Sequence, residues 1–437
     1  MIKPPASVQS LTRTLEQAGH AAWCVGGAVR DALLGIETLD WDLATSARPE
    51  QVQKLFKRTI PVGIQFGTVG VLDRDGVLHE VTTFRHDVET DGRHAVVKFG
   101  ASLEEDLARR DFTINAIAVH AERLEMRDPF DGRGDLERRV VRCVGDAAER
   151  MREDRLRALR ALRFAGRFDF SIEPATWSAI VESAPHLGRL SMERVKQELE
   201  KVMEQVARPA ATIERYREAG ILRALVPAIA DAPAARFAAL DYLARPGLTR
   251  RPDRRMLRLA ALFIEPGVTP PKQLEATLKA LKFSNVEARA AVTLAEAAGR
   301  VSLARLRELA AALQQSATAP TSEAAVELRK IIAQAGRLMV PGLTRILWAR
   351  AKAEGATAAD GLAGLGLYRR ALRSAFTDPL SIADLAVDGE DLQSAGIPPG
   401  KPLGDALKAL LEWVLQDPSR NQRDELLARA RELASAK

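Results

Sequence analysis

The stretch "LDWDLAT", residues 39–45, decides how the N-terminal part of this chain is interpreted. It places Asp40 and Asp42 two positions apart in an otherwise apolar run that predicts a buried strand. Successive side chains of a strand alternate between its faces, so both carboxylates project to the same side. Two ionised carboxylates beside a core repel each other, and a shared divalent cation such as Mg²⁺ removes that repulsion. An isolated pair of this kind also fits a strand end that faces water or basic side chains.

A second feature lies upstream, in "VGGAVRD", residues 25–31. Here a predicted strand gives way to Gly26 and Gly27 and then to a short helix. Glycines let a phosphate approach the backbone, and a helix N-terminus supplies free N–H groups. Arg30 adds a guanidinium that matches phosphate oxygens. A tight turn with a surface arginine explains the same residues equally well, but together with the carboxylates the pattern fits a nucleoside triphosphate.

Two further segments offer polar side chains to the same site. "GTVGVLDRDGVLHEVTTF" consists of two alternating runs joined at Asp75 and Gly76, which predicts a hairpin and a partly antiparallel sheet. Its second strand carries Glu80, either a third carboxylate facing the pair or an exposed glutamate. The segment "LARRDFTINAIAV", residues 107–119, contains Arg109, Arg110, Asp111 and Asn115. These side chains either bind a triphosphate and a ribose hydroxyl or simply lie exposed at the start of a helix.

The densest charge pattern is "REDRLRALRALRFAGRF", residues 152–168. At roughly 100° per residue, four arginines fall within about a third of the helix circumference; they are Arg157, Arg160, Arg163 and Arg167. Apolar residues on the other sides indicate that the helix is packed on several sides, so some of these arginines must border a cleft. A polyanion bound in that cleft is the simplest way to neutralise their charges. The alternative is a solvated stripe in which Asp154 and Arg157 form an ion pair three residues apart.

Length and composition limit the remaining possibilities. A chain of 437 residues is too long for one core, which predicts two to four domains. Two cysteines form neither a metal-ligand pattern nor a disulfide framework, and this indicates a reducing compartment, by default the cytoplasm. We find no signal peptide and no run of about 18 apolar residues, so no membrane association is expected. The net charge of +6 is compatible with a polyanionic partner.

Secondary-structure signals change character along the chain. Up to about residue 145, short β-like runs alternate with turns and short helices, which is typical of an α+β domain. From about residue 146 onward, apolar residues recur at three- and four-residue spacing, the signature of amphipathic helices. We expect no strand in this second part.

Taken in order, six segments resemble the motifs of the class II tRNA nucleotidyltransferase and bacterial poly(A) polymerase family. They are "GGAVRDALLG", "LDWDLAT", "EVTTFR", "DLARRDFTINAIA", "DPFDGRGDL" and "REDRLRALRALRFAGRF", spread over about residues 22–170. The resemblance implies a polymerase-β-like nucleotidyltransferase head with a small, five-stranded mixed sheet, followed by an all-helical neck, body and tail. The expected boundaries are 1–145 for the head, 146–208 for the neck, 209–340 for the body and 341–437 for a tRNA-binding tail.

The same resemblance implies a role for each candidate residue. Catalysis would be two-metal nucleotidyl transfer at three carboxylates, Asp40, Asp42 and Glu80, of which the first two bind the Mg²⁺ ions. Gly27 and Arg30 would contact the triphosphate. Arg110 would contact the nucleotide, supported by Asp111 and Asn115. Asp154 and Arg157 would bind the base, and the next nucleotide-binding residues along the helix would be Arg160 and Arg163. A carboxylate accepts from the exocyclic amine of C or A, and a guanidinium donates to ring acceptors, so side chains can replace a template base.

The implied activity is template-independent addition of C, C and A to the 3′ end of tRNA from CTP and ATP. "RHDVETDGRHAVVK", residues 85–98, stands where the family has a flexible loop associated with adding the terminal A, which argues against an enzyme limited to C. The C-terminal segment 385–427 resembles a tail that contacts the tRNA elbow. Alternatives are an enzyme that adds only the A, a poly(A) polymerase of the same fold, and a non-catalytic RNA-binding relative. "PVGIQFGTV", residues 61–69, lacks the arginine-rich stretch of poly(A) polymerases and favours the tRNA enzyme. The sequence does not define an oligomeric state.

Overall fold

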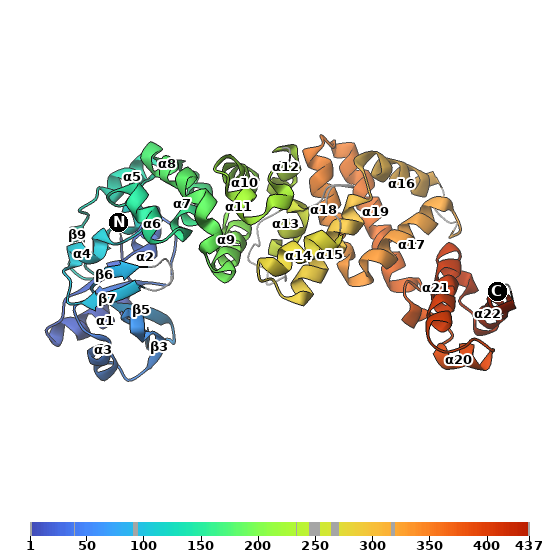
Figure 1. Cartoon of the computed structure of the whole chain (residues 1–437), viewed down its shortest axis with the longest axis horizontal. Coiled ribbons are helices and arrows are strands. Elements are labelled where there is room, and N and C mark those ends of the chain that lie inside the picture. The colour runs from blue at the N-terminus through green and yellow to red at the C-terminus, as the bar shows by residue number, and fades with distance from the viewer. Residues whose placement is uncertain are drawn as a thin grey trace. The chain divides into compact units, whose positions relative to one another are not determined.

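The computed structural model describes residues 2–38, 40–90, 95–232, 234–243, 254–263, 271–315 and 320–435. The chain divides into two compact units, Met1–Asp231 and Ala232–Lys437 (Figure 1). Every element of the sheet lies in the first unit. The finer division into head, neck, body and tail stays a prediction.

The first unit is built on a seven-stranded sheet in the order β3-β4-β5-β2-β1-β8-β9. Its strands are β1 (Ala22–Val25), β2 (Asp42–Thr45), β3 (Thr59–Gly63), β4 (Thr68–Leu72), β5 (Leu78–Thr83), β8 (Ala118–Val119) and β9 (Met126–Arg127). Strand β2 runs parallel to β5 and antiparallel to β1, so the predicted mixed sheet is confirmed. The expected number of five strands is wrong, because the sheet also includes the two-residue strands β8 and β9 at one edge.

Helices cover the sheet from both sides. Alternation along β1 and β2 points Trp23, Val25 and Ala44 to one face, where they pack against Leu103 and Leu107 of α4 (Leu103–Ala108). The opposite face is contacted by α1 (Ala6–Gln17) and α3 (Pro49–Leu55). A short helix, α2 (Gly27–Leu33), follows β1, and the 3-10 turn η2 (Thr113–Asn115) precedes β8. The α4 face carries the polar residues of interest.

The segment expected to be a flexible loop forms a separate two-stranded ribbon. Its strands are β6 (Arg85–Thr90) and β7 (Ala95–Phe99), which pair in antiparallel fashion. Residues 91–94 of this segment lie outside the described residues. The role in adding the terminal A therefore stays a prediction.

A helical layer completes the first unit. It contains α5 (Gly132–Arg138), α6 (Ala147–Glu153), α7 (Leu156–Phe168), α8 (Pro174–Ser183), α9 (Met192–Gln205), α10 (Pro209–Glu218) and α11 (Ile221–Leu225). Helix α7 contacts α6, α8, α9 and α10 and is buried on most sides, as its apolar pattern predicted. The expectation of no strand after residue 146 is wrong in one place: β11 (Ser171–Ile172) pairs with β10 (Val140–Val141), because the chain turns back beside that strand after α7.

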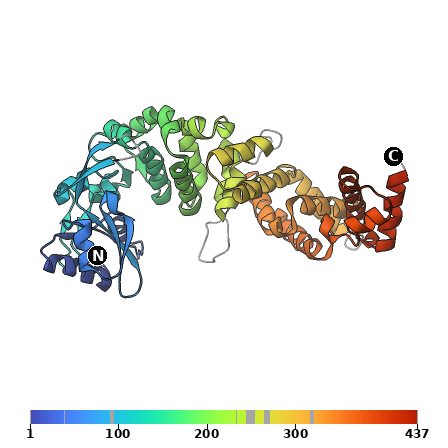
Figure 2. The ribbon, with the colours of Figure 1, turned by 60° about the horizontal axis from the view of Figure 1, so that its bottom comes forward.

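The described part of the second unit is entirely helical (Figure 2). Its helices are α12 (Ala234–Tyr242), α13 (Arg254–Leu262), α14 (Pro271–Ala280), α15 (Asn285–Gly299), α16 (Leu303–Gln315), α17 (Glu323–Ala335), α18 (Val340–Ala353), α19 (Ala358–Thr377), α20 (Gly389–Ser394), α21 (Lys401–Gln416) and α22 (Arg423–Ser435). The last three share a small core that includes Leu392, Leu410 and Leu426. None of the described helices is both long and apolar enough to cross a membrane.

Candidate active site

The two aspartates of the opening stretch lie at the start of β2. The strand begins at Asp42, which is half-buried and pairs with Val25 of β1. Asp40 precedes the strand and is exposed, and Leu39 lies outside the described residues. The strand is therefore shorter than expected, but the two carboxylates still flank the buried Trp41.

Glu80 lies on the same face of the sheet as Asp42. Strands β2 and β5 are parallel with Leu43 opposite Val81, so the preceding residues, Asp42 and Glu80, point the same way. Burial raises the pKa of Asp42 to about 7, and the negative charges of Asp40 and Glu80 add to the rise. Burial and the charge of Asp40 also raise the pKa of Glu80. The three carboxylates thus form one negatively charged cluster.

This cluster faces Arg110, with a glycine between them. A Cβ on Gly26 would lie 3.0 Å from Nη1 of Arg110 and 3.6 Å from Oδ2 of Asp42, and Gly26 has a positive φ of 74°. Only glycine adopts this conformation readily while leaving the gap open. The sequence indicated both glycines of "VGGAVRD" as points of phosphate approach, whereas the family resemblance assigned the contact to Gly27 alone.

Arg110 is held in place but keeps donor capacity. Its Nη2 donates to Oδ2 of Asp106 at 3.1 Å, and Nη1 donates to the carbonyl oxygen of Asn115 at 3.4 Å. Its Nε is buried and makes no hydrogen bond to any residue that the structure describes. A buried donor without a partner is costly, so this guanidinium is suited to an anionic ligand.

Arg30 lies deeper than a direct phosphate contact requires. Its side chain is 4% exposed and donates to Oδ1 of Asp31 and, at 2.5 Å from Nη1, to Oδ1 of Asn115. The guanidinium also stacks 4.9 Å from the ring of Phe164 and 4.8 Å from that of Phe168. These contacts join α2 to α7, and a triphosphate contact by Arg30 stays a prediction.

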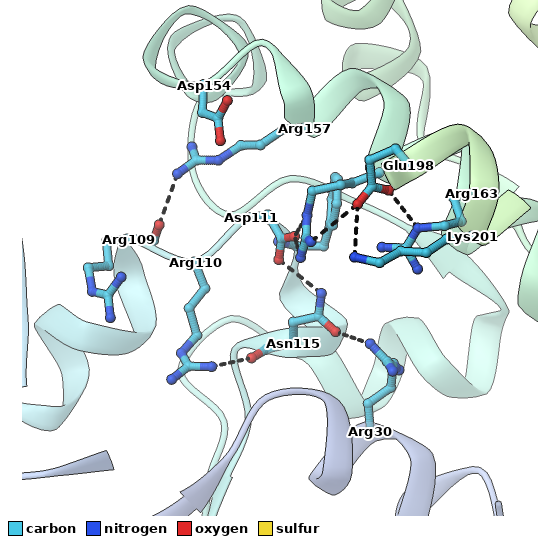
Figure 3. Close-up of polar contacts among 12 residues, drawn as sticks. Arg30, Arg109, Arg110, Asp111, Asn115, Asp154, Arg157, Arg163, Glu198 and Lys201 are labelled. Carbon is cyan, nitrogen blue, oxygen red and sulfur yellow. Dashed lines mark hydrogen bonds and ion pairs between the residues drawn. The ribbon is translucent and has the colours of Figure 1, made fainter. Parts of the chain in front are cut away.

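Asp111 and Asn115 connect the α4 face of the sheet to α7 (Figure 3). Asp111 accepts from Nδ2 of Asn115 at 2.9 Å and from Nε and Nη2 of Arg160 at 2.8 and 2.6 Å. Burial alone would raise the pKa of Asp111, but Arg160 and Asn115 together lower it to about 2. Both residues make buried hydrogen bonds, and their role in supporting a nucleotide site stays a prediction.

The ion pair expected between Asp154 and Arg157 is wrong. Asp154 accepts from the backbone N–H of Leu156 and, at 2.7 Å, from Nη2 of Arg194. Arg157 donates from Nη1 to Oε2 of Glu153 at 2.7 Å and from Nη2 to the carbonyl oxygen of Arg109 at 3.2 Å (Figure 3). Asp154 ends α6 in an extended conformation, so its side chain does not continue the α7 face.

Protein carboxylates pair with three arginines of the α7 stripe: Asp111 pairs with Arg160, Glu198 with Arg163, and Asp31 with Arg167. The predicted contact of this stripe with a polyanion stays a prediction. Arg163 and Glu198 are only 4% and 2% exposed. The spacing of the arginines indicated that negative charge must lie near them. It did not show that residues of α2 and α9 supply two of the carboxylates. Sequence reasoning therefore missed Asp31, Arg194 and Glu198.

No group of three or more His, Cys, Asp or Glu side chains among the described residues is arranged to hold a metal ion. Asp40 and Asp42 supply two hard oxygen donors, which suits a divalent cation whose remaining ligands come from water and phosphate oxygens. The charges of Asp40 and Glu80 raise the pKa of Asp42 more than the charge of Arg110 lowers it, so negative charge is in excess at this cluster. The donor set therefore fits a divalent metal bound together with an anionic substrate.

Comparison with known proteins agrees with this geometry. Residues 22–142 match the model of the "Poly A polymerase head domain", and residues 169–232 match the "Probable RNA and SrmB- binding site of polymerase A". The CCA-adding enzyme of Limosilactobacillus fermentum is 34% identical over 97% of this chain and 95% of its own length. That of Geobacillus kaustophilus is 42% identical over 65% of this chain and 68% of its own length. The crystal structure of the Bacillus stearothermophilus CCA-adding enzyme in complex with CTP is 32% identical, covers 98% of this chain and 97% of its own, and superimposes with a TM-score of 0.72.

A polymerase-β-like head with clustered carboxylates and an adjoining arginine defines a nucleotidyltransferase, a class of enzymes that uses a divalent metal. The chain belongs, within that class, to the family of CCA-adding enzymes.

Proposed function

We propose that this chain adds C, C and A in turn to the 3′ end of tRNA, taking CTP twice and then ATP and releasing pyrophosphate. The observation that supports the reaction is the convergence of Asp42, Gly26 and Arg110 at one point of the α4 face. The CCA-adding enzymes that cover almost the whole chain support the choice of substrates.

The carboxylates provide the reacting end of this site. Asp40 and Asp42 hold Mg²⁺, and Glu80 adds negative charge on the neighbouring strand. The bound cation supplies a Lewis acid that favours ionisation of the RNA 3′-hydroxyl and stabilises the charge on the departing pyrophosphate. Burial and neighbouring negative charge raise the pKa of Asp42 to about 7, so the positive charge of a bound cation favours its ionised form.

Arg110 provides the phosphate end. Asp106 and the carbonyl oxygen of Asn115 hold its terminal nitrogens, so the buried Nε has a fixed direction. Gly26 leaves the space into which a phosphate oxygen fits between this guanidinium and Asp42. The α-phosphate is thereby held beside the carboxylates, and no covalent enzyme intermediate is needed.

Asp154 and Arg157 select the base. Arg157 is fixed by Glu153 and by the carbonyl oxygen of Arg109, which ties the base-reading arginine to the residue before Arg110. Asp154 pairs with Arg194, whose side chain is 38% exposed. A base can therefore replace a solvent-accessible partner at Asp154, whereas Arg157 keeps its orientation.

The test uses three tRNA transcripts, ending at the discriminator base, at C-C and at C-C-A. Each is incubated with Mg²⁺ and CTP, ATP or both, and products are resolved at single-nucleotide length. We expect addition of C, C and A to the first, A to the second and nothing to the third. Addition of A to the C-C transcript alone indicates an A-adding enzyme, and long A tails indicate a poly(A) polymerase. If no product forms, only the RNA-binding alternative remains.

The cytoplasmic location stays a prediction.

A further inference from the structure

The sheet continues past the carboxylates toward an edge that the proposed reaction has not yet used. Glu80 of β5 pairs with Gly70 of β4, and Gly70 pairs with Ile60 of β3. Residues opposite one another on neighbouring strands share a face. The hydroxyls of Thr68 and Thr82, 3.0 Å apart, confirm this alignment one step along the strands. The β3 edge is therefore an extension of the face that carries Asp42 and Glu80.

This extension is apolar and open to solvent. Ile60 and Val62 are 42% and 44% exposed, and Phe66 and Leu78 are each 36% exposed. A Cβ on Gly70 would lie 2.8 Å from both Cδ1 of Leu78 and Cγ2 of Val62, so these side chains close over the glycine. Phe66 lies beside them, with Cδ2 3.8 Å from the Cβ position of Gly63. We call these four side chains, Ile60, Val62, Phe66 and Leu78, the β3 patch.

The two sides of the carboxylate cluster thus differ in chemistry. The β1 side carries Arg110 with its buried donor, which suits a triphosphate. The β3 patch on the other side suits an uncharged, flat group. Phosphoryl transfer places the attacking and the leaving oxygen roughly in line on opposite sides of the reacting phosphorus. If the triphosphate occupies the β1 side, the attacking hydroxyl approaches from the β3 side.

We propose that the β3 patch binds the 3′-terminal nucleotide of the RNA acceptor, with its base against Val62 and Phe66 and its ribose hydroxyl toward Glu80. This inference rests on the proposed function, because it assigns the second substrate of that reaction. The occupant follows from continuity with the catalytic face. Apolar and aromatic surfaces bind any of the four bases by stacking, which suits an acceptor whose last base changes as C is added.

Photocrosslinking on the wild-type chain tests the position directly. The probe is a tRNA transcript that ends at the discriminator base and carries 4-thiouridine there, irradiated in the presence of Mg²⁺ and without nucleotide. We expect the crosslinked peptide to fall within residues 59–82. A crosslink confined to other segments, in a chain that extends the same transcript with CTP, overturns this inference alone. A chain that extends no transcript overturns the proposed function and this inference with it.

Substitution of the patch supplies a second, kinetic readout. Val62→Ser and Phe66→Ser should each lower kcat for the first C by about five-fold or more. The KM for CTP should not change, because the triphosphate lies on the other side. Val181→Ser on α8 is the matched control, since Val181 is 41% exposed and lies outside the sheet. Patch variants that match this control overturn the inference, as does a changed KM for CTP at constant kcat. A shift in the oligomeric mass of the RNA-free Val62→Ser chain would instead identify a protein interface and overturn it too.

Discussion

Replacing Glu198 by Ala tests whether buried ion pairs hold the arginines of α7. Oε2 of Glu198 accepts from Nε of Arg163 at 2.6 Å, and these residues are 2% and 4% exposed. Oε1 lies 4.0 Å from Nη1 of Arg160 and 3.5 Å from Nζ of Lys201. Removing one partner of a buried pair leaves an uncompensated charge and costs about 3–5 kcal/mol, whereas losing an exposed pair costs under about 1 kcal/mol. We therefore expect Glu198→Ala to lower the free energy of opening α7 by about 3–5 kcal/mol.

Amide hydrogen exchange of α7 in the full-length chain measures this quantity locally. The expected loss corresponds to exchange at least about 100-fold faster. Glu198→Gln keeps an acceptor for Arg163 without the charge and should lie between the Ala variant and the wild type. Glu137→Ala is the control, because Glu137 and its partner Arg133 have side chains that are 66% and 62% exposed. A Glu198→Ala chain within about 1 kcal/mol of wild type would refute the reasoning.

Three further expectations concern the site itself. Asp42→Asn should abolish nucleotide incorporation. It should also raise the free energy of unfolding at pH 8 without metal by about 1–3 kcal/mol. The reason is that burial raises the pKa of Asp42 to about 7, so the stability that its protonated form contributes is lost as the pH rises through that value. Calorimetry with a chelator and single-nucleotide gels check both effects, and an active or destabilised variant contradicts them. Arg157→Ala should reduce selectivity among the four nucleotides more than it weakens tRNA binding. Misincorporation rates measure the selectivity, and filter binding measures the affinity for tRNA. Unchanged selectivity would show that Arg157 does not read the base. Burial would raise the pKa of Asp111, but Arg160 and Asn115 lower it to about 2. Ionised Asp111 therefore stabilises the fold above its unfolded pKa of 3.8, and this contribution is lost as the pH falls through about 2. Acid titration of stability should therefore be flatter between pH 4 and 2 in Asp111→Asn, and a parallel curve contradicts the assignment.

The carboxylate cluster could be anticipated from the sequence because its signal is local. The two-residue spacing placed Asp40 beside Asp42, although the strand begins only at Asp42, and the hairpin around Asp75 and Gly76 brought Glu80 to the same sheet. Each step needs only strand alternation and a short turn. The six ordered motifs supplied the mixed sheet and the helical remainder, although not the strands at the far edge.

The partners of the arginines could not be anticipated because they are far apart in sequence. Asp31 reaches Arg167 across 136 positions, and Glu198 reaches Arg163 across 35. A helical stripe of like charge requires neutralisation, but its spacing is the same whether phosphate, water or protein carboxylates provide it. Only the tertiary fold distinguishes these cases, and it places the acids on α2 and α9.

Burial of these partners changes how the motif residues work. Arg30 donates to Asn115, Asn115 donates to Asp111, and Asp111 accepts from Arg160, so one hydrogen-bonded chain runs from α2 through η2 to α7 (Figure 3). Every member is at most one-third exposed, and a broken link leaves a buried polar group without its partner. Effects within such a chain are not additive, since removing one member already costs the orientation of the next. Loss of activity in Arg30 or Asn115 variants is therefore no sign of nucleotide contact, and the same holds for Arg110, because its Nη2 pairs with the buried Asp106.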